Sequence, residues 1–123
     1  MAHGAGGKAT RRLIDGLIAP LLLNGSALGD AASVDVDGAG IAITTDAFVV
    51  TPLRFPGGSI GELAVNGTVN DLAVAGATPI AMVVSFVLEA GLPTSVLEAE
   101  VRAIANAAAA AGIAIVGGDT KVL

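Results

Sequence analysis

Three aspartates lie in stretches of apolar or small residues that would normally exclude a carboxylate. Asp46 follows a pair of threonines, Asp71 follows Asn70, and Asp119 follows a pair of glycines. A buried carboxylate is costly unless a positive charge or hydrogen bonds compensate it. The chain has 6 lysines and arginines against 11 aspartates and glutamates. We therefore interpret the three aspartates as candidate ligands for a hard cation and for the polyphosphate that it would carry.

Two of the features near these motifs have an alternative explanation that needs no ligand. A single aspartate in a strand is typically an exposed edge residue, which is the alternative for Asp46. The glycine-rich segment that ends at Lys8 suits a loop that covers phosphate with its N–H groups. The alternative is that this segment is a frayed terminus, because the segment lacks the spacing of a P-loop. The three aspartates together are more informative than any one of them.

The composition predicts one globular domain and excludes several classes of protein. A chain of 123 residues with 54% apolar and 14% charged residues is neither disordered nor long enough for several domains. A net charge of −5 with 2% aromatic residues disfavours nucleic acid as a partner. The uncharged stretches 72–88 and 103–118 are shorter than the roughly 20 residues of a membrane-spanning helix, so no membrane partner is expected. The chain has no cysteine and no export signal, which favours the cytoplasm.

The first half of the chain must position Asp46. Leucines spaced by four residues predict a helix over 8–23, which Pro20 should end or bend early. Strands are expected over 32–36 and 41–50. Asp37 and Gly38 between them form a strong hairpin signal, because both turn positions tolerate positive φ.

A second helix must position Asp71. The loop 52–58 precedes Ser59 and Glu62, which have capping-box spacing and predict a helix that runs to about residue 76. At 100° per residue, Glu62, Asn66 and Asn70 form one polar stripe, whereas Asp71 falls on a face of small and apolar residues. We therefore expect Asp71 to face the protein interior or a partner.

The remaining elements lead to Asp119. A strand is predicted over 80–89, and a third helix should begin at Thr94 or with a capping box from Ser95, and end at Gly112. A short strand over 113–116 should follow. The two glycines after it would let the backbone turn sharply, so that Asp119 emerges with Thr120 and Lys121 at its end.

Several longer motifs resemble those of the hydrogenase expression/formation protein HypE family. They are the run TTDAFVVTPLRFPGGSIGELAV from residue 44, the run GTVNDLA from 67, residues 86–93, the run GGDTKV from 117, and the glycine-rich HGAGGK from 3. The likeness covers essentially the whole chain and corresponds to the N-terminal domain of the family. It also extends to the superfamily of aminoimidazole ribonucleotide synthetase, selenophosphate synthetase and thiamine-monophosphate kinase.

The resemblance implies a fold and a set of site residues. The fold is a two-layer α+β domain with a mixed or antiparallel sheet packed by helices, which dimerises through that sheet. Residues 1–123 would form a single domain that binds ATP and Mg²⁺. Asp30 would be a weaker fourth ligand, because it lacks the adjacent second aspartate of the superfamily. The implied metal ligands are Asp46, Asp71 and Asp119; the implied ATP-binding residues are these three with Lys8, Asn70 and Thr120; the implied catalytic residue is Lys121.

The resemblance also implies a reaction and partners. Full-length members would use ATP to dehydrate a thiocarboxamide on their C-terminal cysteine to a thiocyanate, the source of the cyanide ligands of [NiFe] hydrogenase. HypF would supply the carbamoyl group, and the HypC–HypD complex would accept the cyanide. This sequence contains neither a cysteine nor a second domain, so we expect the isolated chain to be inactive.

Two other functions stay open at this point. One is an ATP-dependent kinase or synthetase of the same superfamily, of the thiamine-monophosphate kinase or selenophosphate synthetase type. The other, for this chain alone, is a module for dimerisation and partner docking that binds no nucleotide.

Overall fold

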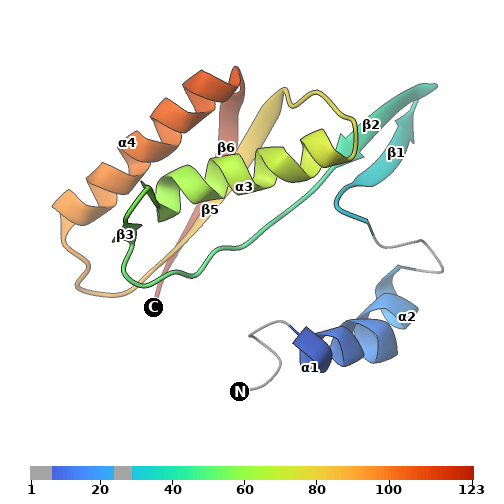
Figure 1. Ribbon diagram of the computed structural model, residues 1–123, viewed down its shortest axis with the longest axis horizontal. Coiled ribbons are helices and arrows are strands. Elements are labelled where there is room, and N and C mark those ends of the chain that lie inside the picture. The colour runs from blue at the N-terminus through green and yellow to red at the C-terminus, as the bar shows by residue number, and fades with distance from the viewer. Residues whose placement is uncertain (1–6, 24–28) are drawn as a thin grey trace.

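The computed structural model describes residues 7–23 and 29–123, whose main body has two layers (Figure 1). Helices α3 (Ile60–Val74) and α4 (Thr94–Ala111) lie side by side on one face of strands β5 (Ala81–Leu88) and β6 (Ala114–Val122). The core lies between these layers, and the predicted α+β class is confirmed. Its buried residues are Val65, Ile104, Ala107, Ala108 and Ile113, with Val69, Met82, Val84 and Phe86 packed against them.

The described strands pair in both directions, but in three separate ladders of two strands instead of a single sheet. Strand β5 pairs with β6 in parallel. Strands β1 (Ala32–Val36) and β2 (Ala39–Ile43) are antiparallel, as are the two-residue strands β3 (Arg54–Phe55) and β4 (Gly58–Ser59). Apart from Ser59, the last pair lies within the stretch 52–58 that was predicted to be a loop.

The hairpin between β1 and β2 is confirmed, but its second strand is shorter than predicted. Val36 faces Ala39, and the two turn residues between them have positive φ, 51° at Asp37 and 84° at Gly38. This is the geometry of a tight two-residue hairpin turn. The prediction of a strand to residue 50 is wrong, because β2 ends at Ile43 and residues 44–50 have no strand partner in the described chain.

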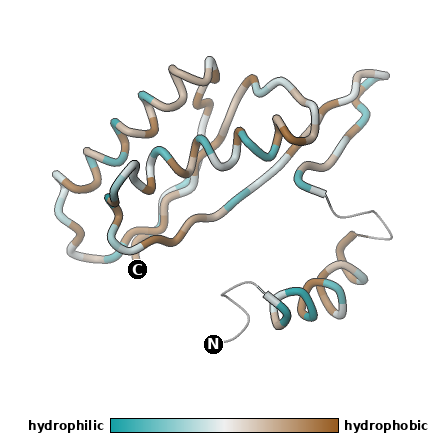
Figure 2. Tube along the Cα trace, viewed as in Figure 1, coloured by the Kyte–Doolittle hydropathy of each residue, from teal (hydrophilic) through white to brown (hydrophobic). Residues whose placement is uncertain are grey.

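The first helical segment continues past Pro20, where the sequence predicted an early end or a bend. It consists of α1 (Gly7–Leu13), a π-helical stretch η2 (Ile14–Ile18) and α2 (Ala19–Leu22). A proline lacks the N–H group of a regular helix and its ring crowds the carbonyl four residues earlier. The wider π-helical stretch includes Gly16, four residues before Pro20, and so relieves that conflict. Figure 2 shows the hydrophilic residues in the first turns of this segment and hydrophobic ones toward its end.

The ends of α3 and α4 follow local sequence signals to different degrees. Ser59 caps α3 as predicted, since its buried hydroxyl accepts a hydrogen bond from the Glu62 N–H at 3.4 Å. Helix α4 begins at Thr94 after Pro93, so the alternative capping box from Ser95 does not form. Gly112 ends α4 in the left-handed conformation, as predicted, with φ of 71°.

Strand β6 runs through the glycine pair at which the sequence predicted a sharp turn. The pairing with β5 shifts between Met82 and Val83, where β6 has one extra residue. After this bulge Gly118 faces Val84, and a Cβ atom at Gly118 would lie 1.8 Å from the Val84 carbonyl oxygen. The glycine is therefore needed for close approach of two strands, because a side chain would clash with β5. Asp119 consequently lies inside β6 and not beyond its end.

The face of β5 away from the helices is apolar and exposed. Residues alternate along β5, with Met82, Val84 and Phe86 toward the helices and Val83 and Val87 each 68% exposed on the other side. An exposed row of valines on a sheet is typical of a surface that another element covers. None of the helices in 7–23 and 29–123 is long and apolar enough to cross a membrane.

Candidate functional site

An open cavity with three carboxylates lies where β1, β2 and the last turn of α3 meet. Its volume is about 380 Å³. We call it the acidic cavity, and it is lined by Gly29, Asp30, Ala31, Ala32, Ile43, Thr44, Thr45, Asp46 and Asp71. The structure thus brings together two of the three predicted metal ligands, Asp46 and Asp71, with Asp30, which was the weaker candidate.

Local contacts place these carboxylates. The Thr44 hydroxyl donates to the Asp30 carbonyl at 2.8 Å, which ties the start of β1 to the end of β2. Asp71 is half-buried in the last turn of α3, whereas its neighbour Asn70 is exposed. The prediction that these two residues lie on different faces is therefore confirmed. Asn70 does not line the acidic cavity, and its predicted role in binding phosphate stays a prediction.

The carboxylates of the acidic cavity act on one another. The pKa of the exposed Asp46 is raised from its ordinary value of 3.8, first by hydrogen bonding with the Asp71 carboxyl, then by slight desolvation and by the negative charges of Asp71 and Asp30. Two neighbouring carboxylates cannot both ionise freely, which holds a proton at the pair or attracts a cation. None of the described residues that line the cavity is basic, so the protein itself supplies no compensating charge there.

This raised pKa predicts a pH dependence of stability. Because the folded-state pKa of Asp46 lies above its unfolded value of 3.8, its contribution to stability is complete below that pH and is lost as the pH rises through the folded pKa. As the pH rises from about 4 to about 7, we expect the free energy of unfolding to fall less for Asp46→Asn than for the parent chain. Urea unfolding across this range measures the difference. Asp35→Asn, at an exposed position of β1, is the control. Equal slopes of the free energy of unfolding against pH for all three proteins would contradict the prediction.

The donor set fits Mg²⁺ better than a fully protein-enclosed metal. Among the described residues, no three carboxylate or histidine side chains form a complete metal-binding cluster. Magnesium commonly takes one or two carboxylates, keeps several waters and binds phosphate oxygens in the remaining positions. Asp46 and Asp71 would therefore hold the ion, which would supply the positive charge that a polyphosphate needs.

The third predicted ligand lies elsewhere in the described structure. Asp119 pairs with Ser85, and Lys121 pairs with Val87, on the exposed face of the β5–β6 ladder. The Lys121 ammonium donates to the Asp119 carboxylate, and this bond, followed by one from the Thr120 N–H, lowers the pKa of Asp119. Asp119, Thr120 and Lys121 do not line the acidic cavity, so their roles stay predictions.

The predicted phosphate-binding lysine near the N-terminus is also separate from the acidic cavity. Lys8 is exposed on α1, where it lines a different open hollow with Gly7, Arg11 and Arg12. Arg11 is paired with Asp15 at 3.3 Å. The rest of the predicted glycine-rich segment, residues 3–6, lies outside the described residues. The role of Lys8 in binding ATP stays a prediction.

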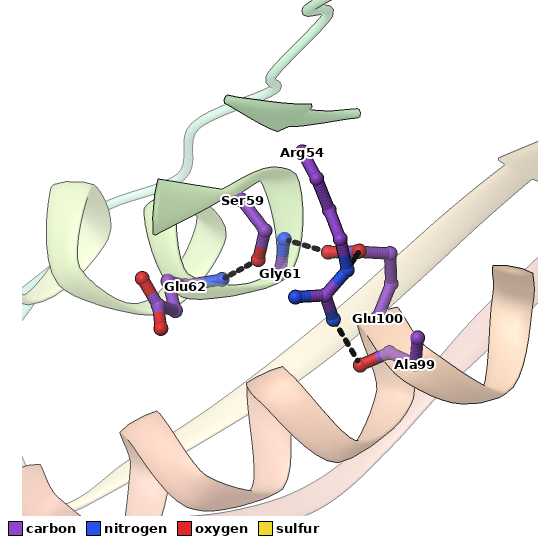
Figure 3. A network of polar contacts seen from close by, with 6 residues as sticks. All are labelled: Arg54, Ser59, Gly61, Glu62, Ala99 and Glu100. Carbon is purple, nitrogen blue, oxygen red and sulfur yellow. Dashed lines mark hydrogen bonds and ion pairs between the residues drawn. The ribbon is translucent and has the colours of Figure 1, made fainter. Parts of the chain in front are cut away.

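Sequence reasoning missed a buried acidic residue that joins both helices (Figure 3). Glu100 on α4 accepts a hydrogen bond from the Gly61 N–H of α3 at 2.9 Å. Its other oxygen makes no hydrogen bond but lies 3.1 Å from Nε of Arg54. Nη2 of Arg54 donates to the Ala99 carbonyl at 3.0 Å. The signal was present, because Glu100 stands on the apolar face of α4, four residues before Ile104. This network fixes the start of the helix that carries Asp71.

The chain is similar to proteins of known class. Residues 28–122 match the family described as AIR synthase related protein, N-terminal domain. The carbamoyl dehydratase HypE of Escherichia coli (strain K12) is 46% identical over 130 residues, which is all of this chain and 39% of that protein. The chain thus spans well under half the length of this relative.

Two solved structures share the fold. The crystal structure of a HypE–HypF complex has a TM-score of 0.81 and 46% identity, and the match covers 90% of this chain and 36% of that one. The crystal structure of HypE in complex with ATP has a TM-score of 0.68 and 45% identity, and the match covers 98% of this chain and 36% of that one. The resemblance to HypE and the α+β fold inferred from the sequence are confirmed.

Proposed function

Because this chain belongs to the AIR synthase related proteins, through their N-terminal domain, we propose that it is the nucleotide-binding domain of a carbamoyl dehydratase of the HypE type. The observation that carries the proposal is the acidic cavity, where Asp46 and Asp71 share an environment without a basic residue among the lining side chains. Such a pair suits a magnesium ion with the phosphates of ATP. The HypE structure in complex with ATP supports nucleotide binding in this family.

The proposed reaction of the whole enzyme is dehydration of a thiocarboxamide on a C-terminal cysteine to a thiocyanate, for the cyanide ligands of [NiFe] hydrogenase. An amide oxygen leaves as phosphate more readily than as hydroxide, so transfer of a phosphoryl group from ATP makes the loss of water favourable. The protein's part in phosphoryl transfer is to position the groups and neutralise the developing charge. Asp46 and Asp71 would do this by holding the metal. The reacting thiol is not within these 123 residues, which contain no cysteine.

We propose HypF as the carbamoyl donor and the HypC–HypD complex as the cyanide acceptor. The HypE–HypF crystal structure supports the first of these partners for the family. The Escherichia coli relative is a carbamoyl dehydratase, which favours this function over a thiamine-monophosphate kinase or selenophosphate synthetase type. Asp119 and Lys121 are proposed as further metal and phosphate ligands, although they lie outside the acidic cavity of the described chain.

We also propose that two copies pair through the exposed face of the β5–β6 ladder. Val83 and Val87 of β5 are each 68% exposed on this face, and Val116 at the bulge of β6 is 65% exposed. Covering them against a second copy would remove apolar surface from water. A sedimentation experiment on the parent chain and on Val83→Lys measures this, and we expect the variant to be the smaller species.

Binding of nucleotide tests the function. We expect calorimetry to detect ATP binding to the chain in the presence of Mg²⁺ and weaker binding when EDTA removes it. Asp71→Asn should weaken the magnesium-dependent binding by about tenfold to a hundredfold, because an amide oxygen carries no charge to neutralise the ion. Asp35→Asn, on β1 and outside the cavity, is the control. Equal affinity for the parent and Asp71→Asn would refute the proposed site.

A further inference from the structure

Asp46 lies in a segment that has little to hold it in place. Residues 44–50 belong to no strand, and within the described part of the chain the backbone from 45 to 52 makes no hydrogen bond. The Thr44 hydroxyl anchors the start of the segment through the Asp30 carbonyl. A second anchor is needed on the far side of Asp46, because an extended backbone with one fixed end can swing.

Phe48 supplies that anchor by packing onto a glycine of α3. A Cβ atom at Gly67 would lie 2.7 Å from Cζ and 3.1 Å from Cε1 of the Phe48 ring. Contacts under 3.0 Å are closer than side chains allow, so a side chain at residue 67 would force the end of the Phe48 ring to shift. A glycine inside a helix costs stability relative to alanine. The close contact with Phe48 explains why Gly67 is nevertheless present.

The distance from Phe48 to Asp46 along the segment matches the distance from Gly67 to Asp71 along α3. In Figure 1 the segment from β2 to β3 runs along α3 in the opposite direction. From Phe48 back to Asp46 an extended chain covers about 6.6 Å. From Gly67 on to Asp71 one turn of helix covers about 6 Å on the same face. Seating the ring at Gly67 therefore places Asp46 beside Asp71.

The exposure of the neighbouring residues agrees with this orientation. Phe48 and Val50 are half-buried, whereas Val49 between them is 93% exposed. Alternate residues of an extended segment point to opposite sides. The side that carries Phe48 is thus the side that faces α3.

We infer that Phe48, seated in the notch left by Gly67, is a positioning residue that sets the register between the segment 44–50 and α3 and so holds Asp46 against Asp71. This inference rests on the proposed function, in which those two carboxylates hold the metal. It adds a residue pair that does not line the acidic cavity. An added methyl group at residue 67 would push the ring, and Asp46 with it, away from the helix.

The first test measures affinity and stability in the same proteins. We expect Gly67→Ala to weaken magnesium-dependent ATP binding about tenfold. Its resistance to urea should fall little, because alanine favours the helix. A shorter side chain removes the clash, so Gly67→Ala with Phe48→Leu should recover most of the affinity. Unchanged affinity in folded Gly67→Ala, or no recovery in the double variant, would overturn the inference.

The second test needs no metal and separates this inference from the proposed function. The chain has no cysteine, so Asp46→Cys with Asp71→Cys introduces the only two thiols. We expect the short bifunctional reagent dibromobimane to bridge them, about tenfold more slowly with Gly67→Ala and at nearly the original rate when Phe48→Leu is added. Equal rates in all three backgrounds would overturn the positioning role. If these rates change as expected while ATP does not bind, the proposed function fails and the positioning role stands.

Discussion

Gly118→Ala is expected to lower the free energy of unfolding by about 3 kcal/mol or more, at or above the upper end of the range for overpacked sites. A Cβ atom at this position would lie 1.8 Å from the Val84 carbonyl oxygen and 2.8 Å from its carbon. These are backbone atoms of β5, so relief requires the two strands to separate. Urea unfolding of the parent and the variant measures the loss.

The adjacent glycine provides a matched control for this prediction. A Cβ atom at Gly117 would meet only Cγ1 of Val83, at 3.9 Å, which is ordinary contact. Gly117→Ala should therefore cost much less than Gly118→Ala, although both residues belong to β6. If the two variants unfolded at the same urea concentration, the close approach of β6 to β5 at Gly118 would be wrong.

Arg54→Met is expected to destabilise the chain by about 2 to 3 kcal/mol. Removing one partner of a buried ion pair typically costs more, but the Arg54 side chain is 59% exposed, so solvent screens part of the interaction. The loss arises because the Glu100 side chain, 7% exposed, would be left with only the Gly61 N–H as a partner. Urea unfolding at neutral pH measures this change.

A double-mutant cycle separates the ionic contribution from lost packing. In the Glu100→Gln background the buried group is neutral, and Arg54→Met should then cost less than about 1 kcal/mol. A loss of the same size in both backgrounds would mean that Arg54 acts through its aliphatic stem. We also expect Arg54→Met to weaken nucleotide binding less than Asp71→Asn does, because it acts at the other end of α3.

The sequence predicted the elements whose ends depend on local chemistry. Ser59, Asp37 and Gly112 each satisfy a nearby backbone group or adopt a conformation that few other residues allow, so their signals are short-range. The different faces of Asn70 and Asp71 also followed from helical periodicity alone. The cap at Ser59 and this periodicity account for the correct prediction that Asp71 lies on a different face of α3 from the exposed Asn70.

The predictions that failed depended on contacts between distant segments. The pair Gly117-Gly118 has the composition of a turn, but close packing of β6 on β5 keeps it in a strand. The apolar stretch after Ile43 resembles a strand, yet the described chain offers it no partner. Glu100 and Phe48 were missed because their importance depends on Arg54 and Gly67, which lie far from them in sequence.

The position of the metal is the central claim, and paramagnetic NMR tests it most directly. Mn²⁺ binds the same oxygen ligands as Mg²⁺ and broadens the signals of nearby residues. Added in small amounts to the chain with ATP, it should broaden the amide signals of Asp46 and Asp71 most strongly, and Asp71→Asn should remove this effect. Broadening confined to Asp119 and Lys121, with sharp signals at Asp46 and Asp71, would contradict the account.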